Sequence, residues 1–333
     1  MSDRISRRDL LKALPVAGLA VASACRGRPQ PYDPSRFAHP ATSDVAILPA
    51  SSYDMELADL VSRGLRLLNV DVRGKRVLLK PNVVEFEHGR VINTHPSLVA
   101  GAAEALRRAG AGSVVVAEGP GHRRDIEYLV TGTGLFDVLR DVGVGFVDLN
   151  QDDVRRVPLK SRFMDLADLA LPVAVLNADL IVSMPKLKTH HWTGMTCSLK
   201  NLFGVVPGAV YGWPKNLLHA RGIENSILDL ASTIRPQLAI VDAIVGMEGD
   251  GPIMGHAKPV GCVVMGDDLV SVDATCARLM GFRASSLTYL RQAGEFLGNL
   301  PAASIHQRGE PLSRFATRFE VLPSHKDLQG SDV

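Results

Sequence analysis

Short apolar runs rich in Val, Ile and Leu alternate with amphipathic segments along most of the chain. The runs predict strands, and the amphipathic segments, with apolar residues three or four apart, predict helices. The predicted strands cover 45–48, 76–80, 113–117, 146–149, 238–241 and 262–265, with a further strand region bracketed by 173–176 and 180–184. The predicted helices cover 55–68, 96–109, 135–142, 223–234 and 269–280. This alternation predicts a Rossmann-like α/β fold, in which helices cover both faces of a mainly parallel sheet.

The same pattern bears on domain organisation. It shows no internal repeat and no linker after residue 43, so we expect a single α/β domain over 43–325. Residues 26–42 are rich in Pro, Arg and Ser, which is typical of a linker. Residues 326–333 are predicted to form a disordered tail.

The N-terminus has the pattern of a targeting segment. Residues 6–12, Ser-Arg-Arg-Asp-Leu-Leu-Lys, resemble a twin-arginine export signal, and the apolar stretch at 13–22 is too short to span a bilayer. Small residues then precede Cys25, which fits either lipidation of Cys25 or cleavage by an ordinary signal peptidase. We therefore expect a signal peptide over 1–25, passage through the twin-arginine translocase, and a periplasmic or otherwise extracytoplasmic location. A lipid on Cys25 would be the one expected contact with the membrane.

Composition narrows the classes of partner. The 333 residues carry a formal net charge of +2, and the six charged residues within 1–24, four basic and two acidic, account for all of it. A neutral body gives no electrostatic reason to expect nucleic acid as a partner. The four cysteines form no C-x-x-C pair, so the chain carries no iron–sulfur motif.

Polar residues follow the predicted strands at their carboxyl ends, where open α/β sheets bind ligands. Lys80 and Asn82 follow one strand, and a Gly-Pro-Gly turn ending in His122 follows another. That turn lacks the spacing of a nucleotide-binding loop. Asp242 follows a third strand, and Asp250 lies a few residues beyond it, where it is available to a metal or a ligand.

The densest cluster contains Lys186, Lys188 and His190. A charge run is usually a solvated face, but this one directly follows an apolar strand, which favours a binding site. The two lysines are suited to holding a carboxylate or phosphate, and a neutral His is suited to carrying a proton or binding a metal. Lys200 either extends to the surface or, in apolar surroundings, has a lowered pKa and acts as a base or anchor. Asn201 is placed to orient a ligand.

Two further residues have structural alternatives. His95 opens a predicted helix, so it either caps that helix or contributes to the site. Asp273 lies within a predicted helix, where a buried hydrogen bond to a neighbouring loop is the simpler reading.

Several of these motifs occur together in a known family. Over roughly 44–282 the chain resembles the domain of unknown function 362 family in the following segments: Lys80-Pro-Asn82, Thr94-His95-Pro96, Met184-Pro-Lys186-Leu-Lys188-Thr-His190, Leu199-Lys200-Asn201-Leu-Phe-Gly204, Glu248-Gly-Asp250-Gly-Pro252 and Val272-Asp273-Ala274. This resemblance implies a fold and does not specify a reaction.

A fainter resemblance is to the nickel-pincer lactate racemases. It rests on His122 after the Gly-containing turn, on His190, on Lys200 with a later Pro-Gly, and on His219. The resemblance implies that Lys200 anchors a cofactor, that His219 binds its metal, and that His122 and His190 exchange the substrate proton. The chain lacks the double Gly before the lysine and the C-terminal domain of that family, which puts the nickel-type cofactor and racemisation in doubt.

Together these observations predict an exported enzyme, an isomerase or an oxidoreductase, that acts on a small anionic substrate with a transition metal or metal-bearing cofactor. The catalytic candidates are His122, His190 and Lys200, and the metal candidate is His219. The candidate binding residues are Lys80, Asn82, His95, Lys186, Lys188, Asn201, Asp242 and Asp250. The alternative is a non-catalytic periplasmic binding protein, which would need the lysines and Gly-rich turns but not three histidines.

Overall fold

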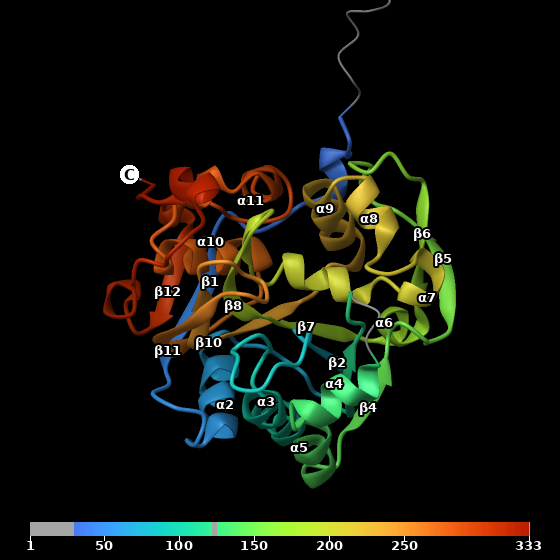
Figure 1. Ribbon diagram of the computed structural model, residues 1–333, viewed down its shortest axis with the longest axis vertical. Coiled ribbons are helices and arrows are strands. Elements are labelled where there is room, and N and C mark those ends of the chain that lie inside the picture. The colour runs from blue at the N-terminus through green and yellow to red at the C-terminus, as the bar shows by residue number, and fades with distance from the viewer. Residues whose placement is uncertain (1–29, 122–124, 333) are drawn as a thin grey trace, which may run out of the picture.

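A mixed β-sheet forms the centre of the molecule. The computed structural model describes residues 30–121 and 125–332. Within them, one ten-stranded sheet has the order β12-β1-β11-β10-β7-β2-β3-β4, with β8 and β9 joined to β10 off this path (Figure 1). The strands are β1 Ser43–Pro49, β2 Arg76–Pro81, β3 Ser113–Glu118, β4 Gly145–Asp148, β7 Leu180–Met184, β8 Lys186–His190, β9 Gly194–Thr196, β10 Leu238–Glu248, β11 His256–Gly266 and β12 Ile305–Gly309.

Most neighbouring strands in this sheet are parallel. β10, β7, β2, β3 and β4 pair in parallel along the main path, and Leu78 of β2 lies opposite Ile181 of β7 and Val115 of β3. β11 is antiparallel to both β10 and β1, so it reverses the direction locally. The predicted mainly parallel α/β sheet is therefore confirmed. Towards its β12 edge, parallel and antiparallel pairs occur together.

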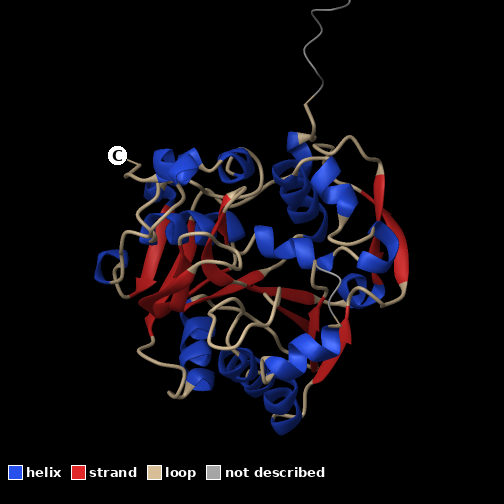
Figure 2. Cartoon of the chain, viewed as in Figure 1, coloured by secondary structure: helices blue, strands red, loops and turns tan. Residues whose placement is uncertain are grey.

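Helices cover both faces of the sheet (Figure 2). The main helices on one face are α2 Leu57–Leu67, α3 Pro96–Arg108, α4 Ile126–Gly132 and α5 Leu135–Asp141. The main helices on the other face are α9 Ile223–Ile234, α10 Leu269–Leu279 and α11 Thr288–Ala293, with shorter pieces α7 Gly208–Tyr211 and α8 Asn216–Ala220. Successive β1 residues alternate between the two cores, Ile47 in one and Leu48 in the other, because strand side chains point to opposite faces in turn.

Some elements differ from the sequence-based predictions. The segment Val173–Asn177, predicted to belong to a strand region, forms the short helix α6, whose first turn is held by the Asp152 carboxylate accepting from the Ala174 N–H at 2.8 Å. A separate hairpin of β5 Val154–Pro158 and β6 Asp168–Pro172 was not predicted. In both places a long-range contact outweighs the local sequence pattern.

The predicted linker and tail are folded where the structure describes them. Tyr32 stacks on Phe296 with ring centroids 4.0 Å apart, and Phe37 is buried, so these two rings attach residues 30–42 to the body although most of the segment is exposed. At the other end Leu328 is buried and Asp332 accepts from the Ser285 hydroxyl at 2.7 Å. The prediction of a disordered tail is therefore wrong for 326–332. At both ends, a few apolar side chains within an otherwise polar segment pack against the body.

No helix within 30–121 and 125–332 is both long enough and apolar enough to cross a membrane. The predicted signal segment and Cys25 lie outside the described residues.

Candidate functional site

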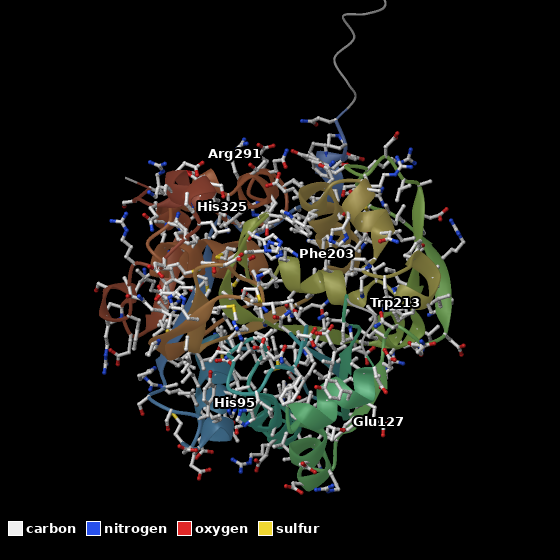
Figure 3. The ribbon with its side chains drawn as sticks, in the orientation of Figure 1. His95, Glu127, Phe203, Trp213, Arg291 and His325 are labelled. Carbon is white, nitrogen blue, oxygen red and sulfur yellow. The ribbon has the colours of Figure 1, made fainter. Side chains whose placement is uncertain are left out.

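A cavity of about 220 Å³ opens beyond the carboxyl ends of β2, β3 and β8. It is lined by Lys80, Asn82, Val83, Val84, Glu118, Gly119, Pro120, Gly121, Lys188, His190, His191, Trp192, Thr196, Lys200, Asn201, Phe203, Gly204, Pro214, Lys215, His219, Pro252 and Ile253. Figure 3 labels Phe203 in this region, and it labels His95 at the start of α3, near the opposite face of the sheet. The cavity lies where ligands bind in open α/β sheets.

Strand β8 supplies the polar residues of the densest sequence cluster. All five residues of Lys186–His190 are buried. Side chains alternate along a strand, so Lys186, Lys188 and His190 point to one side, while Leu187 packs in the apolar core. The other side of the strand also carries Thr189, whose hydroxyl donates to the Gly249 carbonyl at 2.9 Å.

Lys80, at the end of β2, is the centre of a saturated network. Its ammonium donates to Glu118 Oε1 at 2.7 Å, to the Pro81 carbonyl at 3.0 Å and to Asn201 Oδ1 at 3.2 Å. A Cβ on Gly204 would collide with both charged groups, so only glycine fits there. Lys80 therefore carries a buried charge that is already neutralised.

Lys186 belongs to a second network that does not line the cavity. Its ammonium donates to Asp242 Oδ2 at 2.6 Å, to the Tyr53 hydroxyl at 2.9 Å and to the Val245 carbonyl at 3.1 Å. Asp242 also accepts from the Tyr53 hydroxyl at 2.8 Å and from the His95 backbone N–H at 2.9 Å. Burial and the Asp242 charge raise the pKa of Tyr53. Every donor of Lys186 is used, so this group is a closed structural cluster.

Lys188 and Lys215 are buried without a carboxylate partner in the described part of the chain. Lys188 donates to the carbonyls of Ile92 at 2.7 Å and Pro252 at 3.2 Å, and burial lowers its pKa well below the usual value. Lys215 donates to the carbonyls of Gly119 at 2.8 Å and Gly204 at 3.2 Å, and burial lowers its pKa to about 7. Backbone carbonyls accept the hydrogen bonds of these two side chains, but they carry no full negative charge that would neutralise an ammonium.

Lys200 is the most available cation. It begins the 3-10 helix η2, Lys200–Val205. Its ammonium lies 4.3 Å from the centroid of the Phe203 ring, and no hydrogen bond to it is found among the described residues. Burial lowers the pKa of Lys200 to about 8. Lys200 therefore has donors to offer to a ligand.

Asp273 holds the chain just before Lys200. Its carboxylate accepts from the backbone N–H of Ser198 at 2.8 Å and of Leu199 at 3.2 Å. Burial raises the pKa of Asp273 to about 6. The buried hydrogen bond expected for this residue is present, and it fixes the start of η2 and with it the position of Lys200.

The three described histidines of the cavity fall into two kinds. Nδ1 of His190 accepts from the backbone N–H of Trp192 at 3.1 Å and of Thr193 at 3.3 Å, so the neutral ring carries its proton on Nε2. Burial and Lys200 strongly lower the pKa of His190, which keeps the ring neutral. His191 and His219 instead place Nδ1 against the carbonyls of Gly251 at 2.9 Å and Lys215 at 3.3 Å. Carbonyls only accept, so Nδ1 of each of these two rings carries a proton.

That second arrangement is the one metal-binding histidines adopt. His191 and His219 therefore have suitable tautomers for a metal, and His190 does not. Within the described ranges, however, the group of three side chains spaced to hold an ion is Glu248, His256 and Glu320, at the far end of β10. Glu248 there is paired with Lys258 at 3.0 Å. The described residues alone therefore do not place three metal ligands together at the cavity.

The structure thus divides the predicted site residues. Those that line the cavity are Lys80, Asn82, Lys188, His190, Lys200, Asn201 and His219. His95, Lys186 and Asp242 form the closed cluster, and the Asp250 side chain is 53% exposed and does not line the cavity. His122 lies outside the described residues. Lys215 was missed, because a lone lysine after Gly-Trp-Pro gives no pattern that predicts burial.

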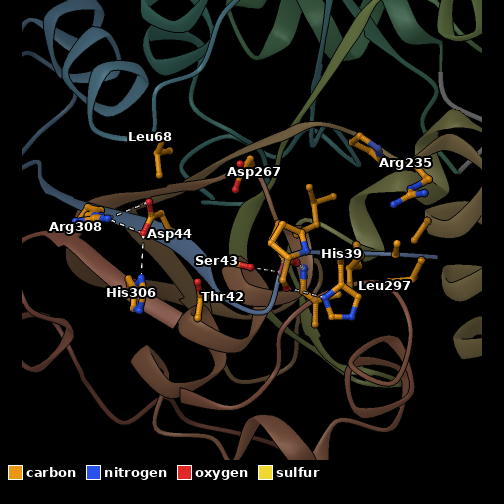
Figure 4. Close-up of a pocket in the computed structure, with 18 residues that line it drawn as sticks. His39, Thr42, Ser43, Asp44, Leu68, Arg235, Asp267, Leu297, His306 and Arg308 are labelled. Atoms are coloured by element: carbon orange, nitrogen blue, oxygen red, sulfur yellow. Dashed lines mark hydrogen bonds and ion pairs between the residues drawn. The ribbon is translucent and has the colours of Figure 1, made fainter. Parts of the chain in front are cut away.

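A larger cavity of about 500 Å³ lies at the opposite edge of the sheet, next to the start of β1 (Figure 4). Asp44 in its wall pairs with Arg308 at 3.1 Å and with His306 at 3.6 Å. Acidic side chains (Asp44, Asp267 and Asp268) and basic ones (Arg235 and Arg308) line it together, so it has no excess of positive charge to attract an anion. The smaller cavity, with its unneutralised lysines, is therefore the better candidate site.

A helix-covered, mainly parallel sheet with a polar cavity at its carboxyl edge defines an α/β protein with a ligand-binding architecture. The family model named domain of unknown function (DUF362) matches residues 77–278, and the chain belongs to this family. A thylakoid-associated protein of Synechocystis sp. is 29% identical over 240 residues, which cover 69% of this chain and 70% of that protein.

Two solved structures show more distant likeness. The lactate racemase apoprotein from Thermoanaerobacterium thermosaccharolyticum matches 67% of this chain at 14% identity and a TM-score of 0.41. A Thermotoga maritima protein matches 64% of this chain at 16% identity and a TM-score of 0.31. In both, the match spans 56% of the solved chain. The resemblance to the racemase is one of structure and is distant.

Proposed function

We propose that this protein binds a small anion in the carboxyl-edge cavity and acts on it as an enzyme. The observation that carries the proposal is the charge of the cavity. Lys188, Lys200 and Lys215 line it, and none of them is paired with a carboxylate in the described part of the chain. Buried charges are usually paired, so an unneutralised cluster is unfavourable unless a ligand supplies the opposite charge.

A catalytic role is supported by the two tautomers in one cavity. His190 carries its proton on Nε2 and His219 carries one on Nδ1, and an imidazole in a cavity is suited to carrying a proton or binding a metal. A metal-bearing cofactor there would supply Lewis-acid or redox chemistry, with His219 as a protein ligand and Lys200 as a charge for the cofactor's anionic groups. A carrier protein would need the lysines but no such pair. Elemental analysis of the full chain, purified without chelators, decides whether a metal is retained, and loss of that metal in His219→Ala would assign it.

The anion site is tested by calorimetric titration of the full chain with succinate and with pyrophosphate at low salt. Lys200→Met should weaken binding by about 10- to 100-fold, because a hydrogen bond to a charged group contributes roughly 1.5–3 kcal/mol. Lys160→Met is the matched control, since Lys160 is exposed and does not line the cavity. Equal affinities in the two variants, or no binding of either anion by the unmodified protein, would reject the proposal.

We further propose that the protein works outside the cytoplasm, on the strength of the Ser-Arg-Arg pattern at 6–8 and the small residues before Cys25. The mass of the mature protein from an exporting host tests this and separates the two readings of Cys25. A chain that begins at Cys25 and carries extra lipid mass supports lipidation. An intact N-terminus would contradict export.

A further inference from the structure

One buried acceptor in the cavity wall has no partner. Asn82 is buried and lines the cavity, and its side-chain oxygen Oδ1 has no hydrogen-bond partner among the described residues. Its backbone is well held, because the Asn82 N–H donates to Thr94 Oγ1 at 2.9 Å and its carbonyl accepts from the Thr94 N–H at 2.9 Å. The missing partner therefore concerns the side chain alone.

The orientation of the Asn82 amide follows from its neighbours. Asn201 Nδ2 donates to the Lys80 carbonyl at 3.0 Å, and a carbonyl can only accept. Asn201 Oδ1 is then the atom that accepts from the Lys80 ammonium at 3.2 Å and from Asn82 Nδ2 at 3.2 Å. Turning the Asn82 amide over would set two oxygens against each other. In this orientation Oδ1 of Asn82 accepts no hydrogen bond from a described residue.

The cavity therefore has two unmet groups of opposite kind. Among the residues that the structure describes, Lys200 has ammonium donors without an acceptor, and Asn82 has an acceptor without a donor. An unsatisfied buried polar group costs about 1–3 kcal/mol. A ligand that joins an anionic group to a hydrogen-bond donor would satisfy both.

We infer that Asn82 is a specificity-determining residue that selects small anions bearing a hydroxyl group. This inference rests on the proposed anion site and goes beyond it by naming the second group of the ligand. A hydroxyl fits better than an ammonium as the donor, because Lys188, Lys200 and Lys215, when charged, would repel a further ammonium in the same cavity. The anionic group is a carboxylate or a phosphate, since a lysine binds both as a point charge.

The test compares matched pairs of probes that differ by one hydroxyl. Malate and succinate form the carboxylate pair, and glycerol 3-phosphate and propyl phosphate form the phosphate pair. Calorimetric titration of the full chain should show the hydroxylated member binding about three- to tenfold more tightly in at least one pair. In Asn82→Leu, which is close in size but lacks the acceptor, that ratio should fall to about one. The control Asn177→Leu changes an exposed asparagine outside the cavity and should keep the ratio.

The outcomes separate the two proposals. If no probe binds, the anion site itself is rejected. If succinate or propyl phosphate binds and the added hydroxyl gives no gain, the anion site stands and the role of Asn82 is rejected. A preference that persists in Asn82→Leu also rejects it. The ratio in the unmodified protein decides the question even if Asn82→Leu fails to fold.

Discussion

Lys186 and Lys188 lie two residues apart on β8, point to the same side, and are both buried, yet their surroundings differ. Lys186 meets Asp242 and Tyr53, and its charge is neutralised at 2.6 Å. Within the described ranges, the ammonium of Lys188 donates only to backbone carbonyls, from loops beyond β2 and β10. The first lysine belongs to the framework of the fold, and the second contributes charge to a cavity. Burial of a lysine is therefore not sufficient to identify a binding residue, and the presence or absence of a counter-charge separates the two roles.

The largest expected effect is on the free energy of unfolding, where the two lysines should differ. Lys186→Met should lower the free energy of unfolding by about 3–5 kcal/mol, because it leaves the Asp242 carboxylate buried without its counter-charge. Lys188→Met should change it by less than about 1 kcal/mol, since the lost hydrogen bonds are offset by removal of an unneutralised buried charge. Urea denaturation of both variants measures the difference. Equal destabilisation would show that the two lysines have the same role.

A smaller effect concerns pH and the cavity lysines. Lysine is charged below its pKa, and the pKa values of Lys215 and Lys200 are lowered to about 7 and about 8. The affinity for succinate, whose carboxylates stay ionised, should be highest below about pH 7 and fall roughly tenfold by about pH 9. Unfolding measured over the same range controls for loss of structure. An affinity that stays constant up to about pH 10 would place these lysines in ordinary surroundings.

The sequence predicted the layers of the fold well, because strands buried on both faces read as continuous Val, Ile and Leu runs. The helix predicted at 223–234 has the bounds of α9, Ile223–Ile234. The β5–β6 hairpin was missed because β5, Val-Arg-Arg-Val-Pro, is mostly exposed and its two arginines interrupt the valines, so it shows no apolar run. The helix at Val173–Asn177 depends on a contact from Asp152 that no local pattern shows.

The position of the candidate site was also predictable in part from the sequence. Polar residues after buried strands pointed to the carboxyl edge of the sheet, and Lys80, Lys188, His190 and Lys200 do line one cavity there. Which lysine is neutralised was not predictable. Lys186 finds its partners 56 and 133 residues away in the chain, and only the fold brings them together.

The most direct test of the account is the titration of Lys200 itself. In the full chain labelled with ¹³C and ¹⁵N at lysine, the Lys200 signal is assigned by its absence in Lys200→Met. We expect this signal to titrate at a pKa of about 8, and to move to a higher pKa when succinate is added, because a bound anion favours the charged form. A signal that titrates near the ordinary lysine value of about 10.4 and does not respond to succinate would contradict the central claim that this cavity is an anion site.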